Sequence, residues 1–88
     1  MPDAPTEVEI AAHFSAMDDS VVLINETVAD DTEALEAMDG DAVEVKLMVT
    51  RNTDHLEIQA AKDWYSESSN SKTPYTGAVT AGKAYVAE

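Results

Sequence analysis

The chain has no cysteine, which excludes a disulfide framework, a thiolate zinc site and a cysteine nucleophile. Cations are also scarce: 5 Lys and Arg stand against 18 Asp and Glu, for a net charge of −13. This balance argues against a protein that binds nucleic acid or anionic lipid through its own cations. No apolar run approaches the roughly 20 residues that span a bilayer, and no basic-then-apolar export signal opens the sequence. We therefore expect a soluble protein that contacts neither nucleic acid nor membrane directly.

What the chain does have is a hydrophobic fraction of 44% in 88 residues, enough for the core of one small domain over residues 1–88. Its clearest periodicity predicts a helix over residues 7–29. Thr6 followed by Glu9 matches a capping box at the start of this helix. Apolar residues then recur at alternating spacings of four and three, the spacing of a coiled-coil seam. These seam residues are Ile10, Phe14, Met17, Val21, Ile24 and Val28.

Residues 30–41 are rich in carboxylates and predict an acidic connector. One helical turn around residues 34–38 fits within it, with Thr32 as a cap and Gly40 as a terminator. Such a connector would let the next element run back along the first helix.

Residues 42–66 allow two interpretations. Apolar residues alternate with polar ones over 42–49, which fits a short strand and would make the fold α+β, with a break at residues 52–54. On a helical wheel the apolar residues instead gather on two opposite sides, one containing Val45 and Val49, the other Val43, Leu47 and Ile58. A central helix packed on both flanks would show this distribution. We favour a helix over 42–66, because Asp41 is a good N-cap and no Gly or Pro interrupts the segment.

The rest of the chain predicts a loop over residues 67–73 and a short helix over 74–86, with Thr73 as its cap and Pro74 in its first turn. Gly77 and Gly82 each weaken this last helix by about 1 kcal/mol relative to alanine, so it should depend on docking. The predicted fold is all-α: an antiparallel hairpin of two long helices with a short C-terminal third helix. An uncovered seam on so small a protein would favour self-association or a partner helix.

The sequence offers no convincing catalytic residue, metal ligand set or cofactor site. His13 and His55 are the only imidazoles, and the Glu9–His13 pair lacks the further donors that a metal site needs. The serines of the loop, from Ser66 to Ser71, have no helix start or glycine elbow behind them. We expect that the protein is not an enzyme and carries no cofactor.

The charge itself has three interpretations: a solvated surface, adaptation to high salt, or mimicry of nucleic acid, with carboxylates in place of phosphates. Trp64 and Tyr65 could anchor a partner, since Trp and Tyr dominate interface hot spots. The ordinary alternative is that both cover the end of the core and receive the last helix with Tyr75 and Tyr85. The candidate partner-binding residues are Asp18, Asp19, Asp30, Asp31, Glu33, Glu36, Trp64 and Tyr65.

One part of the sequence resembles a known group of proteins. It begins with Arg51-Asn52-Thr53-Asp54-His55-Leu56-Glu57-Ile58, continues with Ala61-Lys62-Asp63-Trp64, and ends with Pro74-Tyr75-Thr76 and Ala81-Gly82-Lys83-Ala84-Tyr85. This order of short motifs, over about residues 51–86, resembles small uncharacterised proteins of tailed bacteriophages and prophages. The resemblance implies a phage origin and a helix across residues 51–65, and it transfers no activity.

Together these features predict a non-catalytic, acidic, helical interaction protein, encoded by a phage or prophage. It would dock on a protein partner or self-associate through its seam, in the cytoplasm of the host cell or in association with the virion. The alternative is a DNA mimic that inhibits a DNA-binding host protein.

Overall fold

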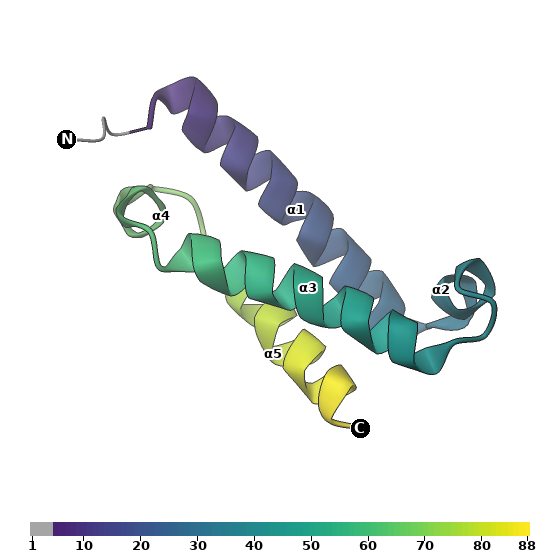
Figure 1. The fold of residues 1–88 in the computed structure, drawn as a ribbon. Helices are drawn as coiled ribbons and strands as arrows, with labels where there is room; N and C mark the ends of the chain where they lie inside the picture. The colour runs from purple at the N-terminus through teal and green to yellow at the C-terminus, as the bar shows by residue number, and fades with distance from the viewer. Residues whose placement is uncertain (1–4) are drawn as a thin grey trace.

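Helices make up most of residues 5–88, the part of the chain that the computed structural model describes. In chain order they are α1 (Glu7–Ala29), α2 (Thr32–Ala37), α3 (Ala42–Ala60), α4 (Asp63–Glu67) and α5 (Thr73–Ala87) (Figure 1). No strand occurs within these residues, so the predicted all-α class is confirmed. The α+β alternative is wrong, because residues 42–49 form the first turns of α3 and no break occurs at residues 52–54.

The first helix begins and ends where its local sequence predicts. The Thr6 hydroxyl oxygen accepts a hydrogen bond from the Glu9 backbone N–H at 3.2 Å, and Glu9 Oε1 accepts one from the Thr6 N–H at 3.3 Å. This is the predicted capping box. The helix ends at Ala29, and Asp30 is already extended.

The acidic connector contains α2, which differs from the prediction at its start. Asp31 is the N-cap and Thr32 the first helical residue, so Thr32 is not the cap. Thr32 instead donates hydrogen bonds from its backbone N–H and its hydroxyl to Asp30 Oδ1. Gly40 ends the turn as predicted: its φ of 78° is left-handed, and its N–H donates to the Leu35 carbonyl at 2.7 Å.

The predicted helix over residues 42–66 is two helices in the structure. Asp41 caps α3 as predicted, with Oδ1 accepting from the N–H groups of Val43 and Glu44 at 3.1 and 3.2 Å. The helix stops at Ala60, Lys62 is extended, and α4 follows. The break has a tertiary reason: Trp64 and Tyr65 turn back to pack on Phe14 of α1, with ring centroids 5.4 and 5.9 Å away. Contacts distant in sequence outweigh the local helix propensity.

The last helix contributes to the core as an equal partner of the two long ones. It begins at Thr73, with Lys72 in the N-cap position that we assigned to Thr73. Each of α1, α3 and α5 contacts the other two, in a body of 45 × 21 × 18 Å (Figure 1). The buried apolar residues are Phe14, Met17, Ile24, Val45, Val49, Leu56, Tyr65, Tyr75 and Ala78.

Candidate interaction surface

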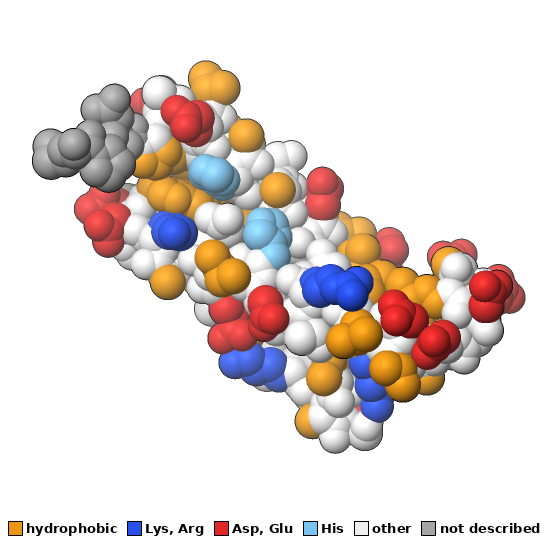
Figure 2. All heavy atoms as spheres, viewed as in Figure 1, with side chains coloured by type: hydrophobic (Ala, Val, Ile, Leu, Met, Phe, Trp, Pro, Cys, Tyr) orange, Lys and Arg blue, Asp and Glu red, His pale blue; other side chains and the backbone are white. Residues whose placement is uncertain are grey.

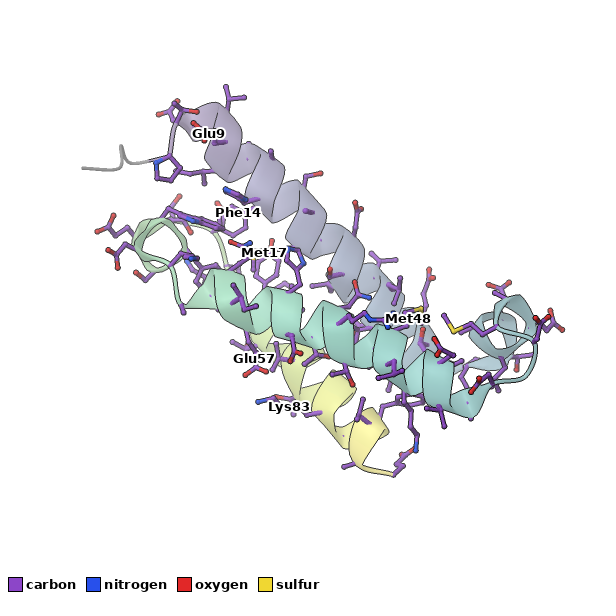
Figure 3. The ribbon with its side chains drawn as sticks, viewed as in Figure 1. Glu9, Phe14, Met17, Met48, Glu57 and Lys83 are labelled. Carbon is purple, nitrogen blue, oxygen red and sulfur yellow. The ribbon has the colours of Figure 1, made fainter. Side chains whose placement is uncertain are left out.

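The apolar seam of α1 lies inside the molecule. Phe14, Met17 and Ile24 are 6%, 0% and 0% exposed, and Figure 3 shows Phe14 and Met17 on the side of α1 that faces α3. Ile10 and Val21 are half-buried against the same core. The packing of α3 and α5 thus covers most of the seam that we expected to be open, which removes the reason for self-association through it.

The aromatic residues of α4 close one end of the core. Tyr65 is buried, and its ring centroid lies 6.0 Å from that of Tyr75. Trp64 is half-buried and stacks on His13 of α1 at 4.8 Å with an interplanar angle of 15°. The interpretation that both residues cover the end of the core is therefore confirmed, but only Tyr65 contacts the last helix, through Tyr75. Tyr85 does not join them, because it contacts Asp31 at the other end of α1.

Two of the proposed partner-binding carboxylates hold α5 in place, one from α1 and one from the connector after it. Asp18 Oδ1 accepts a hydrogen bond from the Tyr75 hydroxyl at 2.6 Å, and Asp31 Oδ2 accepts one from the Tyr85 hydroxyl at 3.1 Å. Burial, aided by the Asp18 carboxylate, raises the pKa of Tyr75 to about 12. Burial, then the bond to Asp31, likewise raises the pKa of Tyr85. These two carboxylates serve the fold.

The other proposed carboxylates face solvent. Asp30 is exposed, and the Thr32 hydroxyl that donates to it lowers the pKa of its carboxyl group. Asp19, Glu33 and Glu36 are exposed and receive no side-chain hydrogen bond or ion pair from the described part of the chain. Figure 2 shows carboxylates gathered where α2 meets the start of α3.

A partly buried polar cluster joins α1 to α3. Ser20 is 5% exposed, and its hydroxyl lies 2.9 Å from Asn52 Oδ1 and 2.9 Å from His55 Nδ1. One hydroxyl proton serves only one of these acceptors, so Ser20 donates to Asn52 while His55 Nδ1–H donates to Ser20, or Ser20 donates to His55. Sequence reasoning missed this cluster. The available signal was Ser20 itself, a polar residue on the core face between Met17 and Ile24.

Both long helices expose apolar side chains: Val8, Val22 and Val28 on α1, and three residues that share one face of α3. Val45, Val49 and Leu56 on its inner face are 0% exposed. On the opposite face Val43, Leu47 and Ile58 are 68%, 41% and 58% exposed. The prediction that α3 packs on both flanks is wrong at this face, because α1 and α5 both lie on its inner side. At the α5 side of the face, Glu57 forms an ion pair with Lys83 at 2.9 Å (Figure 3).

No group of three or more His, Asp or Glu in residues 5–88 is arranged to hold a metal ion. No helix in this range is both long and apolar enough to cross a membrane. Comparisons with family models, with curated proteins and with solved structures found no match to this chain.

Proposed function

We propose that this chain is a non-catalytic interaction protein that docks on a protein partner through the outer face of α3. In this proposal α1 and α3 form an antiparallel hairpin, and α5 locks the hairpin by packing on both helices. The protein would be encoded by a phage or prophage and act in the cytoplasm of the host or with the virion. The motifs of residues 51–86 support the phage origin.

The exposure of Val43, Leu47 and Ile58 is the observation that carries the proposal. These side chains lie on a continuous helix whose other face forms the core, so their backbone is fixed, and the β-branched Val43 and Ile58 have few rotamers in a helix. Rigid apolar residues lose little side-chain entropy on binding and gain from burial, about 25 cal/mol for each Å² removed from water. By contrast, most of the seam of α1 is already covered by α3 and α5, so it has little apolar area left for a partner to bury.

The burial of Ser20 supports a non-catalytic role. A nucleophilic serine must reach its substrate, and the Ser20 hydroxyl is enclosed between α1 and α3. Its two hydrogen-bond partners give it the ordinary role of satisfying polar groups at a helix interface.

The test is capture of partners from a lysate of a bacterial host. The variant V43A/L47A/I58A removes the apolar surface while alanine preserves helix propensity. The control V8A/V22A trims two valines of α1 that are 79% and 53% exposed. We expect the wild type and the control to capture the same partner and the α3 variant to lose it. Equal capture by the α3 variant would contradict the proposal.

A second candidate function is inhibition of a DNA-binding host protein by mimicry of DNA. The exposure of Asp19, Glu33 and Glu36, with no cation paired to them within residues 5–88, favours it. Charged groups free of internal partners can occupy a basic groove, whereas Asp18 and Asp31 are held by tyrosines.

The variant D19N/E33Q/E36Q, which neutralises three carboxylates, separates the two candidates. A mimic should bind the captured protein much more weakly, because these three carboxylates no longer stand in for phosphates. If the partner docks on the outer face of α3 instead, the variant should still capture it, with a smaller loss of affinity. Neutralising Asp18 or Asp31 is unsuitable, because either change would also weaken a hydrogen bond that holds α5 in place.

A further inference from the structure

The outer face of α3 differs in charge along its length. Val43 and Leu47 are one turn apart on this face, so they form a continuous apolar step. Arg51 follows one turn later and separates them from Ile58. The apolar pair therefore belongs to the end of the molecule where α2 contacts α3 (Figure 1).

This end is strongly acidic. Residues 28–49 contain seven carboxylates: Asp30, Asp31, Glu33, Glu36, Asp39, Asp41 and Glu44. The one cation of that segment is Lys46, whose ammonium group donates to the backbone carbonyl of Glu88. Figure 2 shows hydrophobic side chains beside carboxylates at this end of the surface. Even with Arg51, which lies one turn beyond Leu47, carboxylates outnumber cations here, so the net charge of this end is negative.

We propose that Val43 and Leu47, with the carboxylates around them, bind a basic amphipathic helix of the partner. The occupant places an apolar row on the two side chains and its Lys or Arg residues against the flanking acids. Glu44 follows Val43 directly and Asp39 lies in the turn before α3; both are exposed, and neither side chain receives a hydrogen bond from the described residues. This inference rests on the proposed function and specifies where the partner binds and its chemistry.

Charge decides between this occupant and the others. A second copy would bring another net charge of −13 and the same acidic rim against this one, and like charges in contact disfavour association. An anionic lipid surface is repelled for the same reason. A basic helix gains from both the apolar step and the rim.

The probe is a fluorescently labelled 18-residue peptide with Leu and Lys at helical spacing, titrated with the full-length protein and followed by fluorescence anisotropy. The test variants are V43A/L47A for the apolar step and D39N/E44Q for the rim. Their controls are V8A/V22A and E7Q/D19N. The charge control also neutralises one Asp and one Glu. Its Glu7 lies in the first turn of α1, as Glu44 lies in the first turn of α3. Circular dichroism confirms that each variant folds.

We expect V43A/L47A to weaken binding about tenfold and D39N/E44Q about threefold, with a slower association rate. Both controls should stay within about twofold of the wild type. Raising the salt from 50 to 500 mM should weaken wild-type binding and abolish the difference between D39N/E44Q and E7Q/D19N, because the interaction is screened.

Three outcomes of the peptide titration would overturn the inference. The first is a peptide that does not bind the wild type. The second is a loss with V8A/V22A equal to that with V43A/L47A, which would indicate non-specific attraction. The third is a loss with I58A alone and none with V43A/L47A. Each result leaves the proposed function standing if V43A/L47A/I58A still loses its captured partner, so the two failures are distinguishable. Dimerisation of the protein in sedimentation that V43A/L47A abolishes would assign the face to a second copy and refute the basic partner.

Discussion

Replacing Gly82 by alanine tests how closely α5 approaches α3. A Cβ at this position would overlap the Thr53 hydroxyl oxygen and would lie 3.4 Å from Ile24 Cγ2. Thr53 is 3% exposed, and its hydroxyl donates to the Val49 carbonyl at 2.7 Å, so the oxygen is held in place. The added methyl group therefore fits only if α5 moves away from the other two helices.

Two effects of opposite sign set the size of the change. Alanine has a higher helix propensity than glycine by about 1 kcal/mol. Overpacking of a well-packed interface costs about 1–3 kcal/mol and sometimes more. Because the overlap is severe and falls on a side chain that is held by its own helix, we expect the cost to exceed the gain. G82A should lose about 1–2 kcal/mol of unfolding free energy, which lowers Tm by roughly 5–15 °C in a domain of this size.

Gly77 supplies a matched control in the same helix. A Cβ at Gly77 would meet no atom within 4 Å. G77A should therefore keep the gain in propensity and stabilise the protein by about 0.5–1 kcal/mol. The two variants share the same chemistry, so the difference between them isolates the close approach of α5 to α3.

Urea unfolding followed by circular dichroism measures all of these variants. T53A removes the hydroxyl that the new methyl group would meet, so T53A/G82A should be more stable than the sum of the single changes by about 1 kcal/mol. If G82A is as stable as G77A, or if the coupling with Thr53 is zero, α5 does not lie where the structure has it.

Three further changes test local features of the fold. Raising the pH from 9 to 12 should reduce the unfolding free energy, because the folded-state pKa of Tyr75 is about 12 against an ordinary value of 10.0. The protonated hydroxyl stabilises the fold fully below pH 10, and this contribution of about 2–3 kcal/mol is lost between pH 10 and 12. Y75F should flatten this dependence in urea titrations at each pH. S20A should cost about 1–2 kcal/mol, because it removes a buried hydrogen-bonding partner, whereas S15A at an exposed position should change the midpoint little. G40A should cost about 1 kcal/mol in thermal unfolding, because alanine is strained at a φ of 78°.

Each of these has a result that contradicts it. If the loss of stability at high pH were the same in Y75F and the wild type, other groups would be its cause. One such group is Tyr65 of α4, whose pKa is also raised by burial. Equal midpoints for S20A and S15A would mean that the polar cluster between α1 and α3 contributes nothing net. A neutral G40A would place the turn after α2 in another conformation.

The sequence predicts best the features whose cause is local. The start of α1 follows from Thr6 and Glu9, and the start of α3 from Asp41, because capping hydrogen bonds join residues at most three apart. The predicted end of α3 was wrong, because the contacts that end this helix are distant in the sequence. Trp64 and Tyr65 pack on Phe14 and do not continue α3, and no residue near Ala60 predicts that contact.

The candidate surface divides in the same way. That Val43 and Leu47 lie on the face opposite Val45 follows from the helical period alone. Whether that face is covered depends on where α1 and α5 dock, which the period does not specify. The roles of Asp18 and Asp31 were equally out of reach, because each is fixed by a tyrosine more than 50 residues away.

The seam of α1 shows why a coiled-coil spacing does not establish self-association. The spacing states only that one side of the helix is apolar, and another helix of the same chain can cover it as well as a second copy can. In this protein the small residues Ala78 and Gly82 decide the outcome, because both are buried and Gly82 lets α5 approach Ile24 and Thr53 closely. Two small residues one turn apart on a predicted docking helix favour intramolecular closure. With most of the seam covered in this way, the outer face of α3 is the apolar surface that we propose for a partner.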